Sequence, residues 1–222
     1  MTTAQRRIFL IAIVLGVAYI AAIPLQPWPG SWVLKPMPML LYAVLMWRAF
    51  PGAVGRWLAL GYVAAAAGDF FLDYGHRDGL FRQALLAFLV NQIAFLIAFA
   101  KLAAGSPWRW LRALPAIAYG AVLAAWLVPK AGALMLPVAV YLACLLGMVL
   151  MACRVEAAPR LLWLGALLFL LADSLIGVNK FAAPVPNAVL VIVSIYFAGQ
   201  TLIALGLLRH RAEAAAGRAA AG

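Results

Sequence analysis

Charged residues, histidine and cysteine are scarce in this sequence of 222 residues, and each shortage excludes a class of protein. Only 10% of the residues are charged, 68% are hydrophobic and the mean hydropathy is +1.05. This composition excludes a water-soluble globule and indicates an integral membrane protein. The two cysteines, Cys144 and Cys153, predict neither a disulfide framework nor a metal cluster. Two histidines cannot build a three-histidine zinc site, and we expect no metal and no cofactor.

Two common hydrolase motifs are also absent. The chain has no G-x-S-x-G and no H-E-x-x-H string, which argues against a serine hydrolase and a zinc protease. An all-oxygen metal site built from the few acidic residues stays open, but nothing in the sequence supports it. The residues that remain permit chemistry by paired carboxylates.

The net charge of +11 comes from basic residues at the ends of apolar runs. In this position they are topology signals and contacts to lipid head groups, so we expect membrane lipid as a partner and no nucleic acid. Tryptophans also gather near the ends of the runs, which predicts an interfacial belt and no substrate site: Trp28, Trp32, Trp57, Trp108 and Trp110.

The apolar runs predict an all-α, polytopic bundle of eight transmembrane helices, because a crossing of ~30 Å needs about 20 helical residues. Residues 1–208 form one transmembrane domain, and residues 209–222 form a short cytoplasmic tail that we expect to be disordered or frayed. The predicted spans are Ile8–Leu25, Trp32–Phe50, Trp57–Tyr74, Arg82–Ala103, Trp110–Val128, Ala133–Cys153, Leu161–Val178 and Ala188–Leu208.

The basic residues predict the orientation. With the N-terminus in the cytoplasm, twelve of the seventeen Lys and Arg residues lie inside and five lie outside, so we expect both termini in the cytoplasm. The bias towards Ala, Gly and Arg is typical of a high-GC bacterial genome, which places the protein in the bacterial inner membrane. The five outer residues are Lys35, Arg77, Arg82, Lys130 and Lys180.

The stretch Leu170–Phe181 contains an acid, Asp173, in an otherwise apolar span. A charged side chain at mid-membrane costs roughly 2.5–3.5 kcal/mol on insertion scales, so Asp173 needs compensation. Lys180 follows seven residues later on the same helix face, about 10 Å along the axis, and the two could line one cavity. The alternative is that Asp173 is a protonated or hydrogen-bonded packing residue and that Lys180 extends to the interface.

A second acid lies at the same predicted depth. Asp69 comes 12 residues after Trp57, and Asp173 comes 12 residues after Leu161, in two spans of the same direction. Both carboxylates are therefore expected about 18 Å from the cytoplasmic side, facing one water-accessible cavity in the outer half of the membrane.

Further polar residues fall in the same layer. Lys35 lies at the outer end of the second span, Asn91 in the fourth, and Tyr196 and Gln200 on one face of the eighth. Gln92 follows Asn91 in the fourth span, and the alternative for Asn91, Gln92 and Gln200 is interhelical hydrogen bonding worth roughly 0.6–2 kcal/mol. Asp73 and His76 share a helix face with Asp69, but both also fit ordinary residues at the water boundary.

Four groups of residues form a recognisable pattern: Lys35-Pro36-Met37-Pro38-Met39-Leu40-Leu41, Gly68-Asp69-Phe70-Phe71-Leu72, Ala172-Asp173-Ser174 through Asn179-Lys180-Phe181, and Tyr196, Gln200 and Gly206. Together they resemble the YhhN-like family of eight-span lysoplasmalogenases, from about Lys35 to Gly206. The resemblance implies hydrolysis of the vinyl ether bond of a lysophospholipid, lysoplasmalogen, to a fatty aldehyde and a glycerophospho-base.

That chemistry fits the acids. A vinyl ether is hydrolysed by protonation of its β-carbon, and water traps the resulting oxocarbenium ion. The reaction needs a carboxylic acid that is still protonated and a second carboxylate, as in glycosidases. Burial in lipid favours the neutral form of an acid. We expect Asp69 and Asp173 to be the catalytic pair, with the acid and base roles open.

The other residues are expected to bind substrate. Lys35 and Lys180 would hold the phosphate, and Tyr196, Gln200 and Asn91 would position water or the glycerol hydroxyl. Asn179 and Asp73 complete the predicted substrate-binding set. Two other functions stay open: buried acids on two helices also suit a proton-coupled transporter, and the lysine pair alone would suit a non-enzymatic lipid-binding protein.

Overall fold

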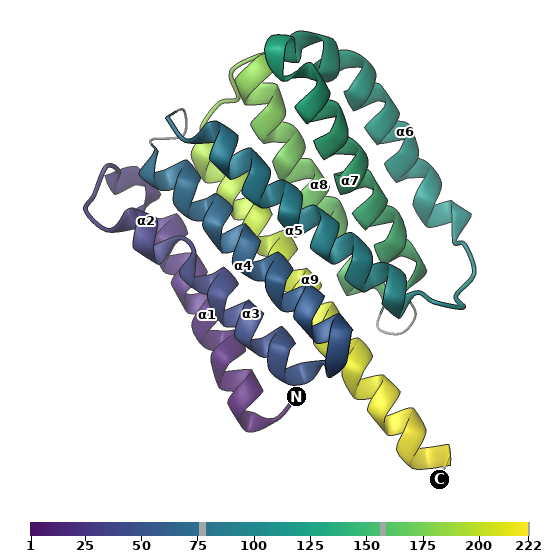
Figure 1. Ribbon diagram of the computed structural model, residues 1–222. Helices are drawn as coiled ribbons and strands as arrows, with labels where there is room; N and C mark the ends of the chain where they lie inside the picture. Colours follow the sequence, from purple (N-terminus) through teal and green to yellow (C-terminus); the bar gives the residue numbers. More distant parts are fainter. Residues whose placement is uncertain (76–78, 156–158, 222) are drawn as a thin grey trace.

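The protein is a bundle of helices (Figure 1). The computed structural model describes residues 1–75, 79–155 and 159–221, and within these ranges the regular structure is entirely helical. The predicted all-α class is therefore confirmed. In chain order the elements are α1 (Thr3–Ala22), η1 (Ile23–Leu25), α2 (Ser31–Leu34), α3 (Met37–Ala49), α4 (Gly52–Tyr74), α5 (Phe81–Leu102), α6 (Trp110–Leu127), η2 (Val128–Leu134), α7 (Met135–Arg154), α8 (Pro159–Phe181) and α9 (Ala188–Ala221).

Each of the eight predicted spans coincides with a helix, and the second span is divided into α2 and α3. Among the described residues, five stretches are long and apolar enough to cross a membrane, and one of them contains both α6 and α7. The eight crossings and the cytoplasmic termini stay predictions. The five stretches are Thr3–Leu25, Phe81–Leu102, Trp110–Arg154, Arg160–Phe181 and Ala188–Gly217.

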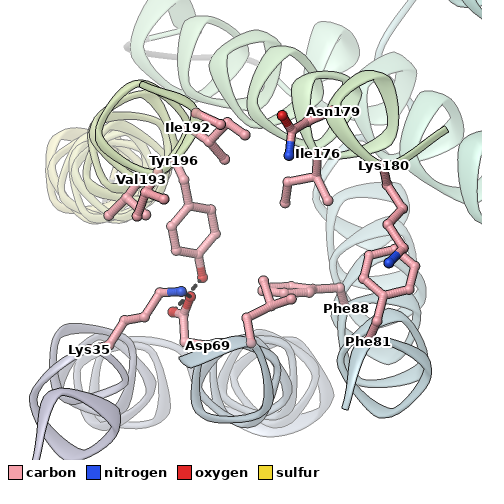
Figure 2. A pocket seen from close by; sticks show the side chains of 13 residues that line it. Lys35, Asp69, Phe81, Phe88, Ile176, Asn179, Lys180, Ile192, Val193 and Tyr196 are labelled. Carbon is pink, nitrogen blue, oxygen red and sulfur yellow. Dashed lines mark hydrogen bonds and ion pairs between the residues drawn. The ribbon is translucent and has the colours of Figure 1, made fainter. Parts of the chain in front are cut away.

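The break between α2 and α3 positions Lys35. Pro36 has no N–H to donate, so regular α-helical bonding is interrupted there. The backbone of Lys35 and Pro36 stays in the right-handed helical region, with φ of −57° and −74°. The chain therefore keeps its direction through the break, and Lys35 projects from the junction towards α4 (Figure 2).

Helices α8 and α9 pack closely because small residues face each other. A Cβ atom built on Gly165 would lie 2.6 Å from the carbonyl oxygen of Gly199, and one built on Gly206 would lie 2.5 Å from the backbone N of Leu162. Backbones that approach this closely leave no room for side chains. This contact fixes Asp173 on α8 and Tyr196 on α9 within one rigid pair of helices.

Both chain ends lie at the same end of the bundle in Figure 1, opposite the loop that joins α1 to α2. The segment 209–222, for which the sequence predicts disorder or fraying, continues α9 as far as Ala221. Arg211 Nε donates to the carbonyl oxygen of Ala49 over 3.0 Å, which ties the start of this extension to the end of α3.

Candidate active site

A pocket of about 110 Å³ lies between the α2–α3 junction and helices α4, α5, α8 and α9. We call it the Asp69 pocket. Figure 2 shows Lys35, Asp69 and Tyr196 pointing towards one another on one side, and Lys180 beside the ring of Phe81 on another. Its polar lining residues are Lys35, Asp69, Asn179, Lys180 and Tyr196, and its apolar ones are Leu72, Phe81, Phe88, Ile176, Ala188, Val189, Ile192 and Val193.

Asp69 is buried beside a cation and a phenol. Lys35 Nζ lies 3.8 Å from Asp69 Oδ1, and the two side chains expose only 7% and 2% of their surface. Tyr196 donates its hydroxyl hydrogen to Asp69 Oδ2 over 2.9 Å. A buried carboxylate is tolerated when a cation and a hydrogen-bond donor compensate it, and Asp69 has both.

Asp173 is buried beside uncharged donors. Its Oδ2 accepts hydrogen bonds from the Tyr141 hydroxyl on α7 and from Gln92 Nε2 on α5, the latter over 2.8 Å. Its Oδ1 is buried and has no hydrogen-bond partner among the described residues. Asp173 lines a second, mainly apolar pocket of about 50 Å³, the Asp173 pocket, between α4, α5, α6, α7 and α8.

The two carboxylates therefore line different pockets, whereas the sequence predicted one shared cavity. The pockets adjoin, because the side chains of Leu72, Phe81, Phe88 and Ile176 line both of them. These four apolar side chains form a wall between Asp69 and Asp173. Any substrate that contacts both acids must lie across this wall.

Phe88 has its place in the wall because α4 carries a glycine opposite it. A Cβ atom on Gly68 would lie 2.6 Å from Cε2 of Phe88, far closer than side chains approach. The Phe88 ring also packs edge-on against Tyr196, with ring centroids 5.9 Å apart. Gly68 therefore gives Phe88 its space, next to the carboxylate that follows it in the chain.

Two predicted residues line the exposed side of the Asp69 pocket. Asn179 and Lys180 are both exposed and stand on the last turns of α8. Lys180 Nζ lies 5.2 Å from the centroid of the Phe81 ring. Asn179 Oδ1 accepts from the backbone N–H of Val185 over 2.9 Å, which holds the loop into α9. Their substrate-binding roles stay predictions.

Three predicted residues line neither pocket. Asn91 is fully buried, and its Nδ2 donates to the carbonyl oxygen of Gly61 over 2.9 Å. This bond joins α5 to α4 and is the interhelical hydrogen bond that the sequence analysis gave as the alternative to substrate binding. The side chain of Gln200 is buried, and its amide has no partner in the described part of the chain. Asp73 lines a separate cavity near the α1–α2 loop. His76 lies outside the described residues.

Tyr141 and Phe88 are the site residues that sequence reasoning missed. Tyr141 is a lone phenol in the apolar run of α7, and a polar group in such a run could have drawn attention to it. Phe88 carries no signal, because an aromatic residue in an apolar helix is ordinary. Within the described ranges, no group of three or more His, Cys, Asp and Glu residues could hold a metal ion.

The fold and the site together define an α-helical membrane protein with two buried carboxylates in adjoining pockets. A family model, that of the YhhN family, matches residues 30–207, and the chain belongs to this family. The resemblance found in the sequence is thereby confirmed.

Several proteins similar to this chain are lysoplasmalogenases. The chain is 33% identical to human lysoplasmalogenase TMEM86B over 186 residues, which cover 81% of this chain and 77% of that protein. It is 34% identical to human lysoplasmalogenase TMEM86A over 164 residues, 68% of this chain and 65% of that protein. It is 30% identical to rat lysoplasmalogenase TMEM86B over 185 residues, 81% of this chain and 75% of that protein. No solved structure matches the chain.

Proposed function

We propose that this protein hydrolyses the vinyl ether bond of a lysoplasmalogen, with Asp173 as the acid and Asp69 as the carboxylate base. Membership of the YhhN family and the names of its relatives support the reaction. The observation that carries the mechanism is the contrast between two buried carboxyl groups in adjoining pockets, one beside a cation and one beside uncharged donors.

Asp173 suits the role of proton donor. Tyr141 and Gln92 both donate to Oδ2, so a proton on this carboxyl group resides on Oδ1. Oδ1 is the buried oxygen without a partner among the described residues, and it is free to donate to a substrate carbon. Apolar surroundings favour the neutral, protonated form of a carboxylic acid.

Asp69 suits the role of the charged partner. Lys35 Nζ at 3.8 Å and the Tyr196 hydroxyl at 2.9 Å both favour an ionised carboxylate. A negative charge next to the substrate stabilises a developing oxocarbenium ion and can take a proton from attacking water. The same division between a neutral acid and a charged carboxylate operates in glycosidases.

The proton transfers balance over one turnover. Asp173 gives its proton to the β-carbon, and the oxocarbenium ion forms at the α-carbon. Water adds its oxygen to the α-carbon and gives one proton to Asp69, which leaves a hemiacetal. Asp69 then returns this proton to the departing glycerol oxygen, while the hemiacetal hydroxyl gives its proton to Asp173. The products are an aldehyde and an alcohol, and both acids regain their starting states.

The linings of the two pockets match the polarity of the groups on either side of the vinyl ether. The first carbons of the alkenyl chain suit the apolar lining of the Asp173 pocket, and the phosphate suits Lys35 and Lys180 in the Asp69 pocket. The vinyl ether then lies at the wall between the pockets, where Phe88 or Ile176 must shift to admit it.

The test is an assay of the purified protein in detergent with lysoplasmalogen and, in parallel, with the matching ester lysolipid. We expect fatty aldehyde from the first and no fatty acid from the second, because the ester has no vinyl ether double bond whose β-carbon could be protonated. Release of fatty acid would contradict the proposal, and so would a lack of aldehyde from protein that is folded.

A further inference from the structure

A separate cavity lies outside the two pockets and is lined by residues of the α1–α2 loop. Figure 1 shows this loop at one end of the bundle. The cavity has a volume of about 820 Å³, and it lies between this loop, α2 and the last turn of α4. The proposed mechanism uses none of its lining residues. The residues that form its chemistry are Trp28, Trp32, Asp73 and Tyr74.

Aromatic rings and a carboxylate meet in this cavity. The rings of Trp32 and Tyr74 stand nearly perpendicular, at 82°, with centroids 5.6 Å apart, so that they form a corner. Asp73 Oδ1 accepts from the Tyr19 hydroxyl over 2.5 Å, whereas Asp73 Oδ2 is buried without a partner among the described residues. Aromatic faces combined with a carboxylate are the means by which proteins bind organic ammonium ions.

The cavity lies one helical turn beyond the ion pair of the Asp69 pocket. On α4, Asp73 follows Asp69 by four residues, and at α2, Ser31 precedes Lys35 by four, a rise of about 6 Å in each case. Tyr19 joins the two places, because its ring centroid is 5.9 Å from Lys35 Nζ and its hydroxyl binds Asp73. Lys35 and Asp73 are thus about one helical turn apart, and the buried Tyr19 side chain contacts both.

We propose that this cavity binds the ammonium group of the substrate's head group, a quaternary or primary amine joined through two methylene groups to the phosphate held by Lys35. The Trp28, Trp32 and Tyr74 rings contact the cation, and the free oxygen of Asp73 balances its charge. The inference rests on the proposed function, since it adds the head-group class to the same substrate. The tryptophans remain at the membrane interface, where head groups lie.

The kinetic test compares a choline lysoplasmalogen with its base-free counterpart, an alkenyl glycerol phosphate. Trp32→Leu removes one ring, and Asp73→Asn removes the charge while its remaining oxygen can still accept from Tyr19. We expect each to raise KM for the choline substrate about tenfold with kcat unchanged, and to leave KM for the base-free substrate unchanged. Trp47→Leu is the matched control, because Trp47 is 61% exposed on α3 and away from the cavity.

The binding test needs no turnover. Saturation-transfer NMR with glycerophosphocholine should show strong transfer to the trimethylammonium protons, and Trp32→Leu and Asp73→Asn should abolish it, whereas Trp47→Leu should not. The inference would be overturned if the Trp32→Leu and Asp73→Asn variants changed KM equally for the choline and the base-free substrate. It would also be overturned if both variants kept the wild-type saturation transfer to glycerophosphocholine. If the wild-type protein releases no aldehyde but shows the transfer and loses it in these variants, the proposed reaction fails and the ammonium site stands.

Discussion

Asp69 and Asp173 are the same residue type in the same bundle, yet their surroundings compensate them in opposite ways. Asp69 has a lysine at 3.8 Å and the Tyr196 phenol at 2.9 Å. Asp173 has the Tyr141 phenol and the Gln92 amide, and no ion pair to it is recorded in the described ranges. In the proposed mechanism the neighbours of Asp69 suit a charge and those of Asp173 suit a neutral acid.

This difference teaches that two equally buried acids in one bundle can have quite different hydrogen-bond and ion-pair partners. Both carboxyl groups are at least 90% buried, and the predicted depths are equal. The neighbouring helices decide the outcome, because the α2–α3 junction supplies a cation and α5 and α7 supply only neutral donors. Changes that exchange or remove these neighbours therefore test the assignment of roles.

The largest effect is expected from the acids themselves. Asp173→Asn removes the proton donor, and we expect aldehyde release to fall by about 10²- to 10⁴-fold. Asp69→Asn should cause a loss of similar size, because the neutral amide cannot stabilise the cation or accept a proton from water. The assay is aldehyde release from lysoplasmalogen at saturating substrate.

The control for this pair is Glu213→Gln, the same change of a carboxylate to an amide on the exposed extension of α9. It should keep wild-type turnover. Near-wild-type turnover in Asp69→Asn or in Asp173→Asn would remove that acid from the mechanism.

The next prediction concerns stability and removes the ion pair between Lys35 and Asp69. Lys35→Met leaves Asp69 buried without its cation, which we expect to lower the free energy of unfolding by about 3 kcal/mol. The double variant Lys35→Met/Asp69→Asn has no unpaired charge and should recover most of this loss while it stays inactive. Unfolding of the variants in detergent measures both values. An equal loss in the single and double variants would show that the ion pair is not what Lys35 contributes.

The sequence predicted the fold well because membrane helices obey a simple rule. Runs of apolar residues located the α-helices, although the second predicted span holds both α2 and α3. Spacing also picked out Asp69 and Asp173 as the buried acids. The helix positions and the two buried acids depend on composition and on spacing along the chain, and both can be read from the sequence.

The partners of the acids could not be predicted in the same way. Tyr141 contacts Asp173 across 32 residues of chain, and Phe88 meets Gly68 across two packed helices. Helix rotation determines both contacts, and periodicity is weak in helices that are apolar all round. For the same reason the sequence predicted one cavity, placed Asn91 at it, and did not anticipate the wall between the pockets.

A smaller effect compares the two phenols. Tyr141→Phe removes one of two donors that keep the Asp173 proton on Oδ1, so we expect kcat to fall about tenfold with KM unchanged. Tyr196→Phe leaves Asp69 with Lys35, so the fall in kcat should be smaller. Steady-state kinetics on both variants gives the ranking. A larger loss in Tyr196→Phe would reverse the assignment of the neutral and charged acids.

The smallest effect tests the wall that separates the two carboxylates. Gly68→Ala places a methyl group where Phe88 now lies, so the ring must move. Moving it costs about 1–3 kcal/mol of stability, and we expect turnover to change only a few-fold because both acids keep their partners. Gly147→Ala is the matched control: it lies in α7, and its added methyl would meet Leu96 at an ordinary 3.5 Å. Both variants are compared by unfolding in detergent and by turnover. If the Gly68→Ala and Gly147→Ala variants were equally stable, the space beside Gly68 would not be what positions Phe88. The wall would then depend on Leu72, Phe81 and Ile176 alone.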